Sequence, residues 1–131
     1  MNRPARQASQ SGCYHVIFRG VNHCHLFEEE VDFERLLALL AALKHQLGFK
    51  VHAYCLMDNH CHLLVRVESA GDLPQLMGRL LGGYALWFNR KYGRSGALIA
   101  NRYKSGSGHW GRFLLSCQQD NKNRPQCPDL S

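Results

Sequence analysis

The sequence predicts a single α+β domain in which amphipathic helices pack on a small antiparallel sheet. A chain of 131 residues with 45% hydrophobic residues has the size and composition of one globular domain with an ordinary core. Segments rich in β-branched and aromatic residues alternate with longer leucine-rich segments at helical spacing. A tight turn at Asp58 and Asn59, residues that tolerate left-handed backbone angles, joins two of the strands as a hairpin.

The first half of the chain predicts a strand followed by a long helix. Residues 14–20 read Tyr-His-Val-Ile-Phe-Arg-Gly, which is typical of a strand. From residue 29 or 30 to residue 47, leucines recur at helical spacing. An acidic run suits the positive start of that helix, and Gly48 suits its end.

The second half predicts the hairpin, a second helix and a changed ending. Residues 49–57 and 60–67 form the hairpin, and Asp72 can cap a helix that ends in a basic cluster near residue 94. A short strand and turn is expected within 97–104. We expect residues 1–12 to form a mobile arm, 13–104 the domain, and 105–131 a divergent, poorly packed tail without periodicity.

Two histidines open the strand after the hairpin turn. His60 and His62 are two apart, so their side chains share one face of the strand, while Cys61 points into the core. The pentapeptide Asn-His-Cys-His-Leu also occurs at residues 22–26, where an acidic run follows and a loop is expected. We therefore favour His60 and His62 as the half-site for a divalent metal, with ordinary polar strand residues as the alternative.

Charge and cysteine content narrow the class of protein. The net charge of +6 and a pI near 9.2 favour a polyanion partner, and nucleic acid is the commonest. The sequence lacks an apolar run of 18 residues and a secretory signal, so we expect no membrane span and a cytoplasmic protein. None of the six cysteines forms a Cys-x-x-Cys pair, so neither a disulfide framework nor a structural zinc site is favoured.

Basic residues dominate the stretch from residue 72 to residue 104, which holds six of them and one acidic residue. Two tyrosines lie among these cations, a mixture that fits single-stranded nucleic acid because bases stack on rings and phosphates pair with cations. The alternative is a helix C-terminus that collects cations for its dipole. The stretch contains Arg79, Arg90, Lys91, Tyr92, Arg94, Arg102, Tyr103 and Lys104.

These motifs occur together, and in this order, in one family. Phe-Arg-Gly ends the first strand, Ala-Tyr-Cys-Leu-Met-Asp-Asn-His-Cys-His-Leu-Leu-Val spans the hairpin, and Phe-Asn-Arg-Lys-Tyr-Gly-Arg and Arg-Tyr-Lys-Ser follow the second helix. From about residue 14 to residue 105 the chain resembles the single-tyrosine HUH transposases, especially the REP-associated tyrosine transposases of bacteria. HUH denotes His, a hydrophobic residue and His, here His60, Cys61 and His62.

The resemblance implies a ferredoxin-like sandwich, a homodimer, and Mg²⁺ or Mn²⁺ held by His60 and His62. It implies that hairpin single-stranded DNA is cut and rejoined through a 5′-phosphotyrosine intermediate. With the motif positions and the basic residues, it predicts a DNA-binding set of Arg19, Asn59, Arg90, Lys91, Arg94, Arg102 and Lys104.

The chain departs from the family where the nucleophile is expected. The family's catalytic tyrosine follows the Arg-Tyr-Lys segment on a helix reading Tyr-Ile-x-x-Asn-Pro, whereas this chain has no tyrosine after Tyr103. Tyr103 and Tyr92 are substitutes in the wrong place, so we expect impaired cleavage. The alternatives are a DNA-binding relic that cannot cut, and a zinc-stabilised basic protein using Cys55, His60 and His62.

Overall fold

A computed structural model describes residues 11–121 and confirms the predicted α+β fold. Four strands form one antiparallel sheet in the order β2-β3-β1-β4. Three α-helices and a short 3₁₀ turn at Val21–His23 complete the described chain. The strands are β1 (Cys13–Arg19), β2 (Lys50–Leu56), β3 (His60–Arg66) and β4 (Lys104–Ser107), and the helices are α1 (Glu30–Leu47), α2 (Asp72–Tyr92) and α3 (Trp110–Asn121).

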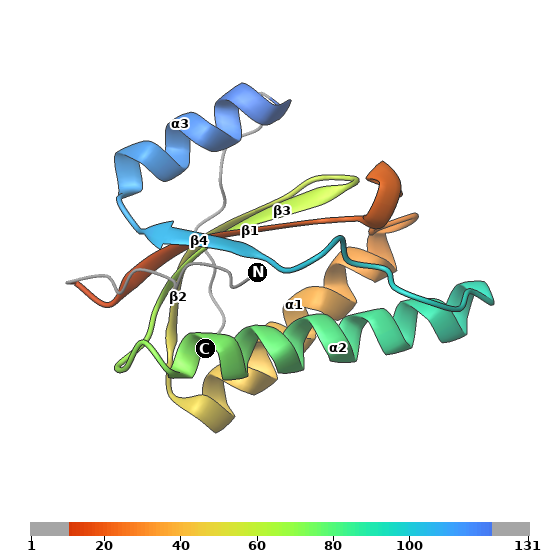
Figure 1. The fold of residues 1–131 in the computed structure, drawn as a ribbon, viewed down its shortest axis with the longest axis horizontal. Coiled ribbons are helices and arrows are strands. Elements are labelled where there is room, and N and C mark those ends of the chain that lie inside the picture. The colour runs from red at the N-terminus through yellow and green to blue at the C-terminus, as the bar shows by residue number, and fades with distance from the viewer. Residues whose placement is uncertain (1–10, 122–131) are drawn as a thin grey trace, which may run out of the picture.

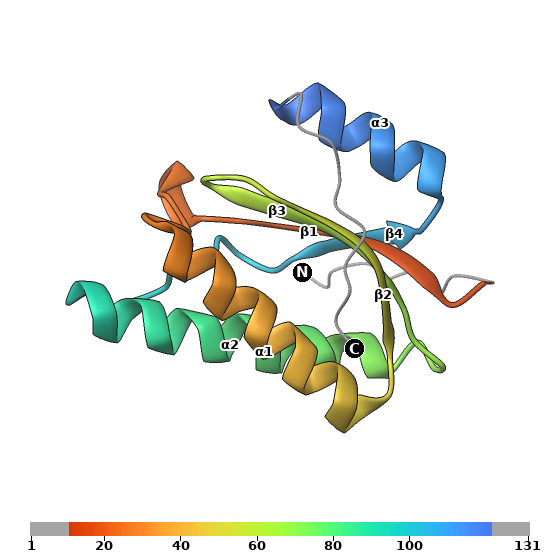
Figure 2. The ribbon, with the colours of Figure 1, turned by 180° about the vertical axis from the view of Figure 1, so that it is seen from behind.

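The helices lie on both sides of the sheet. Helices α1 and α2 cover one face, and α3 lies over the other, as Figures 1 and 2 show from opposite sides. We call these the helix-pair side and the α3 side. Because side chains alternate along a strand, each strand contributes one set of residues to each side.

Two groups of buried residues follow from this alternation. The larger group fills the helix-pair side, where Cys61, Leu63 and Val65 of β3 meet leucines of α1 and α2. The smaller group fills part of the α3 side, where Phe113 and Cys117 of α3 pack with residues of β2 and β3. The second group consists of Ala53, Cys55, Met57, Leu64, Phe113 and Cys117.

The region after residue 97 differs from the sequence expectation. Ile99 makes only an isolated bridge with Gly20, and the fourth strand begins at Lys104, where the expected domain ended. Helix α3 then buries Phe113 and Cys117, which stand four residues apart and so share one helical face. The expected poorly packed tail is therefore packed up to Cys117. Residues 1–10 of the expected arm at 1–12, and residues 122–131, lie outside the described residues.

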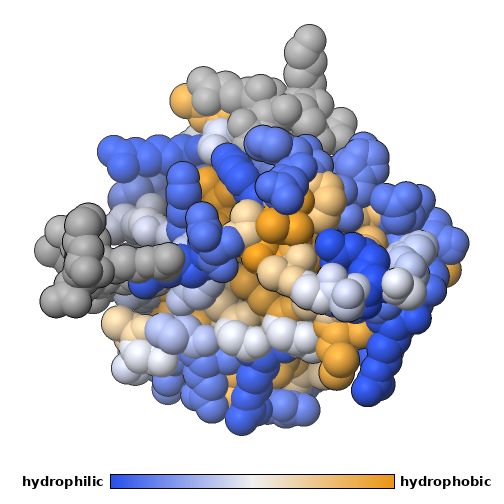
Figure 3. All heavy atoms as spheres, turned by 45° about the vertical axis from the view of Figure 1, so that its right-hand side comes forward, coloured by the Kyte–Doolittle hydropathy of each residue, from blue (hydrophilic) through white to orange (hydrophobic). Residues whose placement is uncertain are grey.

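The surface is mixed in polarity. Figure 3 shows hydrophobic residues in the middle of one face, surrounded by hydrophilic ones. Apolar atoms at a protein surface are ordinary and mark no site by themselves. None of the helices in the described part of the chain is long and apolar enough to cross a membrane.

Candidate nucleic-acid interface

The two predicted histidines lie on the α3 side of the sheet, at the start of β3. The ring centroids of His60 and His62 are 5.4 Å apart, as their spacing in a strand requires. His60 lies opposite Arg19 of β1, and His62 lies opposite Ile17 of β1 and Cys55 of β2. Directly opposed residues share a face, so these side chains all lie on the α3 side of the sheet, and we call His60 and His62 on β3 the histidine row.

The surroundings of His62 are more closed than the sequence suggested. His62 is fully buried, and its Nδ1 shares a hydrogen bond of 2.9 Å with Nε2 of His15 on β1. The ring of Phe113 from α3 stands edge-on to both imidazoles, 5.1 Å from His15 and 6.3 Å from His62. Helix α3 thus covers the inner histidine.

Sequence reasoning missed both His15 and Phe113. His15 carries a usable signal, because its spacing from Arg19 in the first strand puts it on the same face. Phe113 and Cys117 carry a weaker one, since a helix of 12 residues is hard to recognise from two apolar positions.

His60 is oriented by its neighbour at the turn. Its Nδ1 lies 2.8 Å from Oδ1 of Asn59, and an amide oxygen can only accept, so Nδ1–H donates to it. His60 is partly exposed at the end of the row. Asn59 therefore has a positioning contact, and the prediction that it binds DNA stays a prediction.

The described residues do not fit a hard divalent cation. Mg²⁺ prefers several oxygen ligands, whereas the two implied ligands are imidazoles, and one nitrogen of His62 is already engaged with His15. Among residues 11–121, no group of three or more His, Cys, Asp or Glu side chains is arranged to hold a metal. The zinc site imagined from Cys55, His60 and His62 is not formed there either, although Cys55 shares their side of the sheet.

Three exposed cations lie beside the histidine row. Arg19 ends β1, Lys104 begins β4 opposite Ile17, and Arg102 lies in the bend before β4. Together they line a pocket of about 220 Å³ between β1 and residues 100–104. Arg19, Arg102 and Lys104 are the predicted DNA contacts that the fold brings together.

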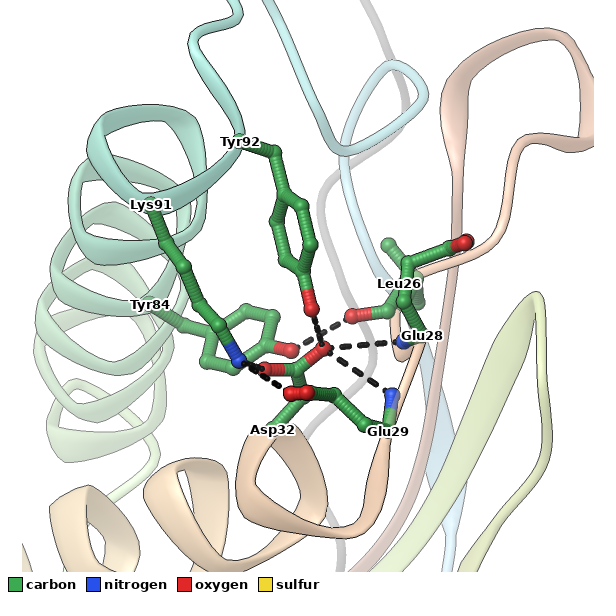
Figure 4. A network of polar contacts seen from close by, with 7 residues as sticks. All are labelled: Leu26, Glu28, Glu29, Asp32, Tyr84, Lys91 and Tyr92. Carbon is green, nitrogen blue, oxygen red and sulfur yellow. Dashed lines mark hydrogen bonds and ion pairs between the residues drawn. The ribbon is translucent and has the colours of Figure 1, made fainter.

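Lys91 and Tyr92 belong instead to a network on the helix-pair side (Figure 4). The Nζ of Lys91 lies 2.7 Å from Oδ1 of the fully buried Asp32, and the hydroxyl of Tyr92 donates to Oδ2. The backbone amides of Glu28 and Glu29 donate to the same carboxylate. Asp32 is the third residue of α1 and forms a capping box with Glu29, so the network fixes the helix start.

The network also sets the protonation of its members. Burial would raise the pKa of Asp32, but the hydrogen bonds from Lys91, Tyr92 and the two amides lower it overall. Desolvation and the hydrogen bond to Asp32 raise the pKa of the Tyr92 phenol. The Tyr92 hydroxyl is engaged with Asp32, and its role as a substitute nucleophile stays a prediction.

Arg90 and Arg94 lie with this network at the end of α2, away from the histidines. Arg90 is exposed, and Arg94 donates to the side chain of Asn89 and to the carbonyl of Ala97. The basic cluster predicted from sequence is therefore split between two sides of the sheet. Arg90, Lys91 and Arg94 lie at the end of a helix, where the helix dipole favours cations, and the prediction that they bind DNA stays a prediction.

The tyrosines of the chain pack with the buried group on the helix-pair side. The chain has five tyrosines, and all fall among the described residues. Each belongs to the buried group on the helix-pair side or packs against it. Tyr103, the other substitute nucleophile, precedes Lys104, and its ring packs against that same group. The five are Tyr14, Tyr54, Tyr84, Tyr92 and Tyr103.

Comparison with known proteins points to one family. The family model described as "Transposase IS200 like" matches residues 8–112, which reaches the first turn of α3. No curated protein sequence matches the chain.

Two solved structures share the fold. One is a REP-associated tyrosine transposase bound to a REP hairpin, with a TM-score of 0.70, 10% identity, and coverage of 94% of this chain and 76% of that one. The other is a putative transposase from Deinococcus radiodurans, with a TM-score of 0.64, 18% identity, and coverage of 94% and 99%.

Proposed function

The chain belongs to the IS200-like transposase family, and from this premise we propose that it binds hairpin DNA with a single-stranded flank but forms no phosphotyrosine link. The binding surface is the α3 side of the sheet beside His60, with Arg19, Arg102 and Lys104 facing the phosphates. A similar fold is bound to a REP hairpin in one of the structures compared above, which supports the ligand class.

One observation carries the loss of cleavage. A nucleophile must be within hydrogen-bond reach of the phosphate that it attacks. All five tyrosines pack in or against the buried group on the helix-pair side, whereas His60 and His62 lie on the α3 side of the sheet. The second candidate, cutting and rejoining through Tyr103 or Tyr92, would need one of these rings to leave its packing.

Binding and cleavage can be tested on one substrate, a labelled DNA hairpin with an unpaired flank on each side. Fluorescence anisotropy over a salt series measures affinity, and a denaturing gel after incubation with Mg²⁺ or Mn²⁺ detects a covalent adduct. We expect binding that weakens steeply with salt, because phosphate contacts release counterions. We expect no adduct.

Two results would contradict the proposal. An adduct that disappears in Tyr103→Phe or Tyr92→Phe would establish the cutting enzyme instead. Equal affinity for the hairpin and for an unrelated duplex of the same length would remove the claim that this ligand is recognised.

The homodimer implied by the resemblance is also a proposal. Strands β2 and β4 are the edges of the described sheet, and open edges are one route to pairing between chains. Sedimentation velocity with and without the hairpin measures the oligomeric state, and a monomer under both conditions would rule the dimer out.

A further inference from the structure

The inner histidine of the row belongs to a cluster of three rings from three elements. The ring centroids of His15 on β1 and His62 on β3 are 5.1 Å apart, and a hydrogen bond of 2.9 Å joins Nε2 of His15 to Nδ1 of His62. Phe113 of α3 stands edge-on to both imidazoles. We call these three residues the ring cluster. It connects the two central strands of the sheet to the helix that covers them (Figure 1).

Helix α3 has few other buried contacts with the sheet. Among its residues 110–117, only Phe113 and Cys117 are buried. An isolated helix of 12 residues is marginal in water, so most of its stability has to come from packing. Because Phe113 packs directly on the two imidazoles, the arrangement of the histidines affects how stably α3 packs on the sheet.

The position of His62 would solvate a divalent cation poorly. A buried cation needs oxygen ligands or opposite charges around it, and none of the four strands contains an Asp or Glu residue. The buried group that α3 shares with the sheet consists of apolar residues and two cysteines. A metal-ligating histidine usually donates its second N–H to a carboxylate or a carbonyl, whereas Nδ1 of His62 pairs with another imidazole.

We propose that His62 is a structural residue in this chain, and that together with His15 it binds the ring of Phe113 and keeps α3 on the sheet without a metal ion. The hydrogen bond between the imidazoles fixes the orientation of both rings under Phe113. One histidine of the two-histidine motif then stabilises the fold, and His60 at the partly exposed end has no part in this contact. The proposal concerns the packing of the chain itself and does not depend on the DNA ligand proposed above.

Alanine variants distinguish the ring cluster from a metal site, because the two have only His62 in common. The ring cluster contains His15 and His62, whereas the implied metal site contains His60 and His62. Hydrogen exchange of α3 and the midpoint of thermal unfolding are measured for His15→Ala, His60→Ala and His62→Ala, first with EDTA and then with Mn²⁺. His60→Ala is the matched control, since it deletes the same side chain from the same strand as His62→Ala.

The expected results follow from the hydrogen bond between the imidazoles. With EDTA, exchange in α3 should be about tenfold faster in His62→Ala and in His15→Ala, as the loss of a buried hydrogen-bond partner would produce. His60→Ala should stay within about twofold of the wild-type protein. The double variant of His15 and His62 should exchange little faster than either single variant, because both substitutions delete the same contact. Mn²⁺ should change none of these values, since only a ligand that binds the folded protein stabilises it.

Two results would overturn the proposal. The first is a thermal midpoint that rises saturably with Mn²⁺ in the wild-type protein and no longer rises in His60→Ala and His62→Ala. Electron paramagnetic resonance of Mn²⁺ checks this directly on the wild-type protein, because the signal of the free ion is lost on binding. The second is wild-type exchange of α3 in His15→Ala. Should His62→Ala fail to fold, the Mn²⁺ titration of the wild-type protein and the exchange of His15→Ala still test the proposal.

Discussion

The two sides of the sheet use the same residue types for different purposes. On the helix-pair side, Lys91 and Tyr92 contact the buried carboxylate of Asp32 and join the ends of two helices. On the α3 side, Lys104 and Arg102 are exposed around a pocket, and neither pairs with a carboxylate of residues 11–121. A cation that meets a buried carboxylate stabilises the fold, whereas a cation without one remains available to a phosphate.

This difference divides the DNA contacts that composition predicts into two groups. Basic residues interleaved with tyrosines suggest nucleic acid, yet Lys91, Tyr92 and Arg94 at the end of α2 make internal contacts. The prediction that this helix end also binds DNA stays a prediction. The distinguishing partner, Asp32, lies about sixty positions earlier in the chain, at the start of the first helix. If the two sides act separately, substitutions on the helix-pair side should change stability, and substitutions on the α3 side should change DNA binding.

The largest effect is expected from Asp32→Ala. The substitution leaves two backbone amides and the Tyr92 hydroxyl without their acceptor and breaks the pair with Lys91. Breaking a buried ion pair by removing one partner costs about 3–5 kcal/mol. Urea unfolding measures the free energy, and Glu34→Ala, an exposed acidic residue on the same helix, should change it by less than about 0.5 kcal/mol. A loss below 1 kcal/mol in Asp32→Ala would contradict the structural role.

Phe113→Ala tests the cover over the histidines and should have the next largest effect. Phe113 is fully buried between α3 and the sheet, and truncating a buried Phe costs about 3 kcal/mol or somewhat more. Hydrogen exchange should show faster exchange in α3 while the amides of α1 and α2 keep their protection, because those helices pack on the other side. Equal loss of protection in all three helices would mean that α3 is part of one cooperative core.

Much of this architecture could be predicted from the sequence, because local pattern decides it. The hairpin turn, the stop of the first helix at Gly48 and the shared face of His60 and His62 follow from short-range rules, and the structure has all three. The pairing of Lys91 with Asp32, the His15 contact and the cover by Phe113 join residues distant in sequence. No periodicity encodes them, so only the fold reveals them.

Lowering the pH should destabilise the protein first through the network around Asp32 on the helix-pair side. The pKa of Asp32 is lower in the folded protein than in the unfolded chain, since its hydrogen bonds outweigh the effect of burial. A carboxylate whose pKa is lowered by folding stabilises the protein fully at pH values above its pKa in the unfolded chain, which is about 3.9. This stabilisation is lost as the pH falls through the pKa of the folded state. Urea midpoints between pH 7 and pH 3 should therefore fall, and less steeply in Asp32→Asn. Parallel curves for the two proteins would assign the acid sensitivity to other groups.

The smallest effects come from the pair that compares the two sides most directly, Lys91→Ala and Lys104→Ala. Lys91→Ala removes the ion pair with Asp32 but leaves its other three donors in place, so we expect a stability loss of about 1 kcal/mol and unchanged affinity for the hairpin. Lys104→Ala keeps the backbone pairing of β4 and should change stability by less than about 0.5 kcal/mol, but weaken binding about fivefold and lower the salt slope by about 0.7.

The two substitutions delete the same side chain, so net charge and nonspecific attraction change equally. If both weaken DNA binding alike, long-range charge explains the affinity and neither side of the sheet is the interface. If the effects separate as expected, the phosphates lie on the α3 side.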